Sequence, residues 1–256
     1  MSGSARGNAP TPGGAPMRQG VPARGCAPVP RRGAYAVLEA AALIAPAAAM
    51  GACAAAGIEH TALLTLVVVL AALALFFAVY EHRRPRLRET MPVAVLAALA
   101  AAGRILFAPF PDVKPVSAIA IVAGVAFGRQ SGFMVGALAA LVSNFFFGQG
   151  PWTPWQMYAW GLVGYGAGLL AHSRLFERTA GVCAYGFAAC LGYGFILNLW
   201  SILGFFHPQT ASEALAVYAA ALPFDIAHGI ATVAFLLILY APWRRKIARV
   251  KVKYGL

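Results

Sequence analysis

Long apolar runs recur along this sequence and constrain its fold more than any other feature. A helix needs about 20 apolar residues to cross the ~30 Å hydrocarbon core of a bilayer, and several runs approach or exceed that length. Of the 256 residues, 61% are hydrophobic and only 11% are charged, whereas a soluble domain carries far more charge. The sequence therefore predicts an all-α polytopic membrane protein rather than a β-barrel, whose strands would be short and alternating.

Eight apolar segments are expected to form the helices of this protein. The fourth is the shortest, so we expect it to be tilted or partly buried in protein. The segments are 35–57, 61–80, 91–109, 115–128, 131–147, 154–171, 181–204 and 221–241.

Basic residues favour one orientation of these helices. Cytoplasmic loops of membrane proteins are enriched in Lys and Arg. If all eight segments span, the basic residues of the tails and of every second loop lie on one side of the membrane. The loops on the other side carry only Lys114, beside Glu59, Asp112 and Glu213. We therefore expect a multi-pass protein of the plasma membrane with both termini in the cytoplasm. The net charge of +12 then reflects topology and contact with anionic lipids of the bilayer, and we expect no nucleic-acid partner.

The composition divides the chain into four parts. Residues 1–34 are rich in Gly, Pro, Ala and Arg and are expected to be a disordered cytoplasmic tail. Residues 35–80 are expected to form a transmembrane hairpin of two helices with almost no polar atoms in the spans, as is typical of packing or assembly. Residues 91–241 form a six-helix unit with many polar and small residues, and residues 242–256 a basic cytoplasmic tail.

Polar residues lie at similar depth in four helices of the six-helix unit. At 1.5 Å per residue, all of them fall within roughly 10 Å of the expected outer boundary. They are Arg104, Asn144, Asn198, Asp225 and His228. Polar groups inside spans usually face a cavity or a partner, so the pattern predicts a substrate cavity open to the outside.

Each of these polar residues also has a purely structural interpretation. Arg104 could extend to the lipid headgroups or pair with Asp225. His228 lies one turn from Asp225 and could be a hydrogen-bonded core residue. Asn144 and Asn198 could link helices through hydrogen bonds.

The segment SNFFFGQGPWTPWQ, residues 143–156, joins two helices of the same unit. Its glycines and Pro151 break the first helix, and Pro154 can begin the next. Its tryptophans are typical of a membrane interface, while its amides favour a loop that also closes over a ligand. The side chains here that we expect to contact substrate are Gln149, Trp152, Trp155, Gln156 and Tyr158.

Small residues recur every four positions in several of the helices. Such stripes let helix backbones approach closely, either inside the bundle or at a surface that docks another membrane subunit. One stripe comprises Gly124, Gly128, Gly132, Gly136 and Ala140 and ends at Asn144, and another comprises Ala94, Ala98 and Ala102.

Common catalytic and nucleotide-binding motifs are missing from the sequence. Nothing reads GxxxxGK[ST], HExxH or GxSxG, and the four cysteines form no CxxC. We therefore expect no enzyme activity, no cofactor and no metal. Uphill transport by this chain would need energy from partner proteins.

Three stretches together resemble the substrate-binding S component of energy-coupling factor (ECF) vitamin transporters. GRILFAPFPDVKPVSAIAIVAGVAFG is followed by GFMVGALAALVSNFFFGQGPWTPWQMYAWGLVGYGAGLL, and the later LPFDIAHGIATVAF is similar to the last helix of such proteins. The resemblance covers about residues 91–241. Within the family, GQGPWTPWQ and the PxVxPV loop look most like the cobalamin-type S components.

This resemblance implies a six-helix S component that captures a vitamin, with a cobalamin-like substrate favoured, from outside. It also implies a coupling membrane subunit and two cytoplasmic ATPases that power import. The coupling subunit would dock on Ala94, Ala98 and Ala102, and the loops 110–115, 148–153 and 205–220 would help to gate the site. The two N-terminal helices depart from the family's six-helix pattern.

Three other interpretations remain open at this stage. One is an S component for a flavin or purine-like substrate. Another is a membrane-embedded enzyme acting on a lipid or vitamin precursor, with His228 and Asp225 as acid and base. The third is a purely structural membrane subunit.

Overall fold

The computed structural model describes residues 3, 32–56, 61–82, 85, 87–206, 208 and 210–254. Within these residues every regular element is helical, which confirms the all-α expectation. The α-helices are α1 (Arg32–Ala56), α2 (Thr61–His82), α3 (Leu87–Leu106), α4 (Val116–Phe127), α5 (Arg129–Phe147), α6 (Trp152–Leu170), α7 (Thr179–Ser201) and α8 (Ala211–Tyr254). A 3₁₀ turn at Arg174–Glu177 precedes α7, and a π-helical turn at Ile202–Phe206 follows it.

Five helical stretches of the described chain are long and apolar enough to cross a membrane. They are Ala62–His82, Glu89–Leu106, Arg129–Phe147, Thr179–Phe206 and Ala211–Val250. The protein is therefore a multi-pass membrane protein, although by length and composition fewer helices qualify as spans than the eight apolar segments predicted. Of the expected tail at residues 1–34, all but Gly3 and the first turn of α1 lies outside the described residues.

Helix α4 occupies the centre of the bundle. It has 12 residues, and at 1.5 Å per residue its length of about 18 Å falls short of the hydrocarbon core. Residues Val116 to Gly124 are all buried, and α4 packs against α3, α5, α6 and α8. The expectation that the fourth segment is buried in protein is confirmed.

Glycines bring α4, α5 and α6 into close contact. A Cβ atom on Gly124 or Gly132 would overlap the backbone at Gly164, and one on Gly136 would overlap the backbone at Trp160. This stripe therefore packs inside the bundle and does not form an external docking surface. Gly128 has another role: its φ of 93° lies in the region that favours glycine, and it forms the turn between α4 and α5.

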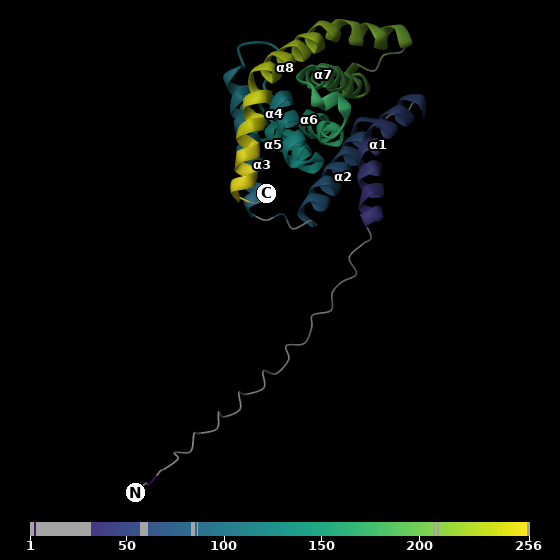
Figure 1. Ribbon diagram of the computed structural model, residues 1–256. Coiled ribbons are helices and arrows are strands. Elements are labelled where there is room, and N and C mark those ends of the chain that lie inside the picture. Colours follow the sequence, from purple (N-terminus) through teal and green to yellow (C-terminus); the bar gives the residue numbers. More distant parts are fainter. Residues whose placement is uncertain are drawn as a thin grey trace.

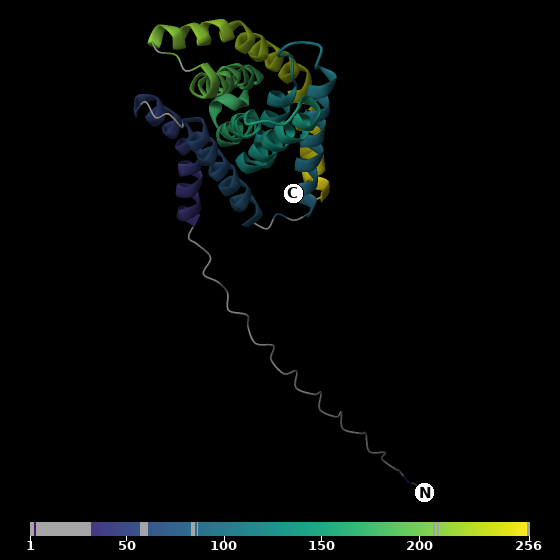
Figure 2. The same cartoon turned by 180° about the vertical axis from the view of Figure 1, so that it is seen from behind.

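The hairpin of α1 and α2 packs on the side of the bundle away from α3 (Figures 1 and 2). Helix α2 contacts both α5 and α6. Phe76 of α2 stacks on Phe133 of α5 with ring centroids 3.9 Å apart, and it meets Tyr165 of α6 edge-on. The hairpin leaves the outer face of α3 uncovered.

Helix α8 begins earlier than the sequence predicted. The expected loop at 205–220 is helical from Ala211 onward, and the helix continues through the expected basic tail to Tyr254. The physical reason lies in the segment TASEALAVYAA: Thr210 Oγ1 accepts a 3.3 Å hydrogen bond from the backbone N–H of Glu213, an N-cap followed by strong helix formers. The first part of α8 crosses the end of the bundle and the last part runs along it (Figure 1), and Pro223 lies inside the helix.

Candidate functional site

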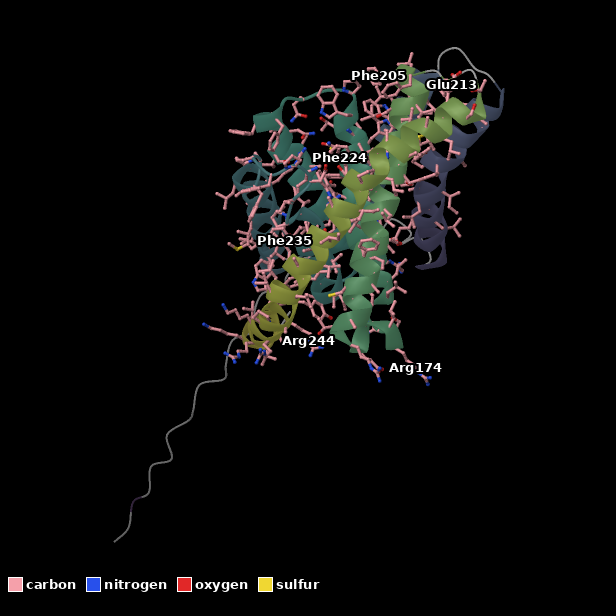
Figure 3. All side chains as sticks on the ribbon, turned by 90° about the horizontal axis from the view of Figure 1, so that it is seen from above. Arg174, Phe205, Glu213, Phe224, Phe235 and Arg244 are labelled. Carbon is pink, nitrogen blue, oxygen red and sulfur yellow. The ribbon has the colours of Figure 1, made fainter. Side chains whose placement is uncertain are left out.

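The two ends of the bundle differ in charge. Figure 3 shows Arg174 and Arg244 at one end and Phe205 and Glu213 at the other. Helix α5 begins at Arg129 and ends at Phe147, so its C-terminus lies at the end away from the basic residues. The predicted polar residues of α3, α5 and α6 cluster at that end.

Arg104 is the centre of a buried polar cluster. Its side chain is 8% exposed, and its Nη1 donates hydrogen bonds of 2.6 Å to Ser143 Oγ and 2.6 Å to Asn144 Oδ1. The guanidinium carbon also lies 4.6 Å from the ring centroid of Phe147 and 4.9 Å from that of Trp160. Arg104 therefore points into the bundle, and its hydrogen bonds go to α5 and not to Asp225.

Asn144 joins three helices through this cluster. While its oxygen accepts from Arg104 of α3, its Nδ2 donates to Thr153 Oγ1 at 2.9 Å and to Gln156 Oε1 at 2.8 Å, both on α6. The side chain is fully buried, so both of its polar atoms are engaged as buried polar groups require. The amides of the 143–156 segment thus fix the relative positions of α3, α5 and α6.

A second buried cluster surrounds Ser117 in the middle of the bundle. Trp160 Nε1 donates to Ser117 Oγ at 3.2 Å, and the same oxygen lies 3.0 Å from His228 Nε2. The Ser117 hydroxyl can donate to a bare Nε2 or accept from Nε2–H, according to which nitrogen of His228 carries the proton. Tyr193 stacks on Trp160 at 4.7 Å and meets His228 edge-on at 5.3 Å. The two clusters meet at Trp160.

Asn198 and Asp225 form a separate pair between α7 and α8. Asn198 Nδ2 donates to Asp225 Oδ2 at 3.1 Å. A Cβ on Gly194 would overlap the Asp225 carboxylate, so this glycine lets the carboxylate lie against α7. Asp225 also borders a largely apolar cavity of about 310 Å³ with Phe195 and Tyr218.

A cavity of about 310 Å³ lies beside Arg104. It is formed by the end of α3, the loop that follows, and the end of α5, and Lys114 Nζ and Asp112 Oδ1 form a 2.8 Å ion pair on its wall. Its lining residues are Arg104, Phe107, Ala108, Phe110, Pro111, Asp112, Lys114 and Phe147. Aromatic walls with a few charged groups are typical of a site for a small, partly apolar ligand.

Four further predicted site residues lie outside both clusters and outside the Asn198–Asp225 pair. Gln149 is exposed and donates to the backbone oxygen of Leu141 at 3.0 Å, and the ring of Trp152 packs over Gly150. Tyr158 donates to the backbone oxygen of Leu43 in α1 at 2.5 Å. Trp155 is fully buried, meets Tyr158 edge-on, and its Nε1 has no hydrogen-bond partner among the described residues.

Sequence reasoning missed several members of the two clusters. Trp160 lies four residues after Gln156, so helical spacing places the two side chains on one face of α6, a signal that could have been used. Ser117 is a polar residue in an otherwise apolar segment and could have been noticed for that reason. Nothing in the sequence singles out Thr153 or Tyr193 as their partners.

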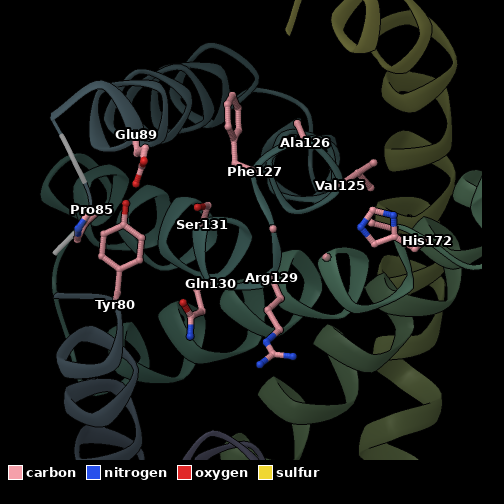
Figure 4. Close-up of a pocket in the computed structure, with 13 residues that line it drawn as sticks. Tyr80, Pro85, Glu89, Val125, Ala126, Phe127, Arg129, Gln130, Ser131 and His172 are labelled. Carbon is pink, nitrogen blue, oxygen red and sulfur yellow. The ribbon is translucent and has the colours of Figure 1, made fainter. Parts of the chain in front are cut away.

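A larger cavity, of about 450 Å³, lies at the basic end of the bundle. Figure 4 shows Tyr80 directed toward Glu89 on one wall, with Arg129, Gln130 and His172 around the rest. None of the predicted substrate residues lines this cavity. The described part of the chain also contains no group of three or more His, Cys, Asp or Glu side chains that could hold a metal ion.

Comparison with known proteins gives one clear match. The model of the family described as ECF-type riboflavin transporter, S component, matches residues 86–245, which include α3 to α7 and most of α8. No curated protein and no solved structure matches the chain. The family is of the riboflavin type, so the expected closeness to cobalamin-type proteins is not supported. The chain belongs to the family of ECF-type riboflavin transporter S components.

Proposed function

We propose that this protein binds riboflavin or a closely related flavin outside the cell and delivers it inward as the substrate-specific subunit of an ECF importer. The family match supports this role for residues 86–245. The observation that carries the proposal is the buried Arg104 cluster beside a cavity of about 310 Å³, at the end of the bundle away from the basic residues. Basic residues favour the cytoplasmic side, so this end faces outward.

The chemistry of the cavity suits a flavin. The flavin ring system is planar and carries carbonyl oxygens on one edge, which call for aromatic walls and for hydrogen-bond donors. Phe107, Phe110 and Phe147 line the cavity. A guanidinium has five N–H donors. Among the described residues, the hydrogen bonds of Arg104 to Ser143 and Asn144 use only Nη1, which leaves Nε and Nη2 for ligand oxygens.

A cobalamin-like substrate is less well supported than a flavin. The cobalamin-type resemblance rests on the GQGPWTPWQ segment and the PxVxPV loop. Within that segment, Gln149 folds back on α5 and Trp152 packs over Gly150. Cobalamin is also several times larger than riboflavin, so cobalamin fits a cavity of about 310 Å³ poorly. Gln149, Trp152, Trp155 and Tyr158 would then contribute to the loop and to helix packing more than to ligand contact.

The proposed partners are a coupling membrane subunit and two cytoplasmic ATPases. Ala94, Ala98 and Ala102 are exposed on α3, while Ala97 and Ala101 beside them are buried. An exposed stripe of alanines lets another helix approach closely. The uncovered face of α3 is therefore the proposed docking surface.

Equilibrium binding to the purified full-length protein tests the substrate. Riboflavin fluorescence is expected to be quenched in a saturable titration, with a tight dissociation constant, because aromatic rings surround the bound ring system. Cobalamin and a purine nucleoside, added as competitors, should not displace riboflavin at equal concentration. Saturable binding of cobalamin together with no binding of riboflavin would refute the flavin assignment.

Enzymatic action by His228 and Asp225 receives no support from their contacts. His228 bonds to Ser117 and Asp225 to Asn198, and the matched family is a transporter component. Recovered ligand should therefore be chemically unchanged by mass spectrometry after prolonged incubation with the protein. A converted product that disappears in His228→Ala would favour the enzyme instead.

A further inference from the structure

The N-terminal hairpin contains a buried acid that apolar helices rarely hold. Glu39 of α1 is 1% exposed and lies outside the residues matched by the family model. Its Oε2 lies 2.9 Å from Arg129 Nη2 and accepts a 2.9 Å hydrogen bond from the hydroxyl of Tyr165, while Gln130 Nε2 donates to its Oε1. Three donors from α5 and α6 therefore converge on one carboxylate of α1.

We propose that Glu39 is a positioning residue that makes the hairpin a working part of the substrate-binding unit, by holding α6 and the start of α5 in the arrangement the substrate site needs. A buried carboxylate is costly unless donors surround it. The converse also holds: once Glu39 is removed, Gln130 and Tyr165 lose a buried acceptor and Arg129 loses its ion-pair partner. The hairpin is thus attached through specific polar contacts as well as through apolar packing.

The basic end of the bundle lets this ion pair exist inside a membrane protein. The Arg129 side chain is 37% exposed and lines the 450 Å³ cavity at that end. Figure 4 shows Arg129 and Gln130 pointing to the same side, away from Phe127. Arg129 is accessible from this cavity, so of the two charged groups only the carboxylate is fully buried.

A second bond between the hairpin and α6 adds to the first. Tyr158 donates to the backbone oxygen of Leu43, which lies one turn after Glu39 in α1. Tyr158 and Tyr165 are two turns apart on α6, so α1 holds that helix at two levels. Between them on the same helix lies Trp160, which contacts both Arg104 and Ser117.

Helix α6 is the element through which the hairpin acts on the site. Toward the hairpin it presents Tyr158 and Tyr165, and toward α3 and α5 it presents Gln156, which binds Asn144. The backbones of α5 and α6 are in contact at Gly164, so α6 has no room to shift locally against α5. A tilt of α6 therefore displaces Gln156 and Trp160 together. The position of Glu39 therefore sets the geometry around Arg104, although the two residues lie toward opposite ends of the bundle.

Variants of the full-length protein test this inference, which rests on the proposed function only for its ligand. We expect Glu39→Ala to raise the riboflavin dissociation constant of the active fraction at least tenfold, and Glu39→Gln, which keeps the volume and one acceptor, to recover part of that loss. The matched control is Glu81→Ala, because Glu81 is an exposed acid of the same hairpin. A role in stability alone would lower the melting temperature and the active fraction while leaving the dissociation constant unchanged.

A second measurement does not depend on the ligand. A specific protease site placed at residues 83–86 allows the purified full-length protein to be cut between α2 and α3. We expect the two fragments to co-elute in size-exclusion chromatography for the otherwise unchanged protein, and to separate for Glu39→Ala.

Co-elution together with an unchanged dissociation constant in Glu39→Ala would overturn the inference. If riboflavin does not bind even the unaltered protein, the proposed substrate is wrong. The fragment-separation experiment alone then tests whether Glu39 holds the hairpin on the bundle. If Glu39→Ala does not yield folded protein, Glu39→Gln and Arg129→Gln carry both measurements.

Discussion

Nη1 of Arg104 donates a hydrogen bond of 2.6 Å to Oδ1 of Asn144. This bond joins α3 to α5, and the amide nitrogen of Asn144 extends the connection to Thr153 and Gln156 of α6. A buried cation held by neutral oxygens and aromatic rings keeps donors available for a ligand, whereas a carboxylate partner would compete with ligand oxygens for them.

Asn144→Ala is therefore expected to weaken both the ligand site and the helix contacts. A buried group left without a partner costs about 1–3 kcal/mol, and the substitution removes one hydrogen bond each from Arg104, Thr153 and Gln156. We expect riboflavin affinity to fall at least tenfold, as measured by fluorescence titration. Phe145→Ala, at a neighbouring exposed residue of α5, is the control and should bind riboflavin as the unaltered protein does. Equal affinities for the two variants would show that Asn144 does not contribute to the ligand site.

Close packing of α5 against α6 makes a prediction about stability. Gly164→Ala would place a methyl group onto the backbone of Gly132, and overpacking of this kind costs about 1–3 kcal/mol. We expect a lower melting temperature in detergent. Gly192→Ala is the matched control, since no atom lies within 4 Å of a Cβ at that position of α7 and replacing a helical glycine gains up to about 1 kcal/mol. If the two variants melted alike, the backbone contact would be less close than described.

How much the sequence could predict differs from element to element. The burial of α4 followed from the shortness of the apolar segment 115–128, which does not reach the length needed to cross a bilayer. The early start of α8 could also be predicted from the sequence, since Thr210 and Glu213 have the spacing of a capping box. The expectation of a loop at 205–220 did not use this signal. For the alanines of α3 the spacing allowed either internal packing or an external docking surface, and only the family resemblance implied docking; Ala94, Ala98 and Ala102 are exposed in the fold.

The partners within the site were less predictable. Depth along a helix follows from residue counting, and on that basis Arg104 and Asp225 were expected at a similar level. The choice between Asp225 and Asn144 as the partner of Arg104 depends on how α3, α5 and α8 are rotated, which a single sequence does not encode. Glu39 was missed for a similar reason: an acid near the start of an apolar segment resembles a flanking charge until its three donors are seen.

The Ser117 cluster leads to a third prediction. Ser117→Ala removes the acceptor of Trp160 Nε1 and the partner of His228 Nε2, which leaves two buried polar atoms unpaired. We expect a loss of about 1–3 kcal/mol in stability for each, seen as a lower melting temperature. In Ser201→Ala the lost bond is a local one to the backbone of Leu197, so this control should melt close to the unaltered protein. Equal melting temperatures would show that water replaces the Ser117 hydroxyl.

The exposed alanines of α3 give the last prediction. Ala98→Leu adds bulk to a face that the hairpin leaves open (Figure 2), and a partner helix that packs against small residues would be displaced by it. We expect riboflavin binding by the isolated subunit to stay unchanged, while co-purification with the coupling subunit and ATP-dependent uptake both fall at least tenfold. Binding is spared because Ala98 lies on the outer face of α3, away from Arg104.

The control for this prediction is Ala188→Leu, which makes the same change at an exposed residue of α7. It adds equal volume on another face of the bundle, so general effects on insertion or expression would appear in both variants. A loss of assembly limited to Ala98→Leu assigns docking to α3. Intact assembly and uptake in Ala98→Leu would move the coupling surface elsewhere, and the exposed faces of α7 and α8 would be the next to test, since the hairpin occupies the side opposite α3.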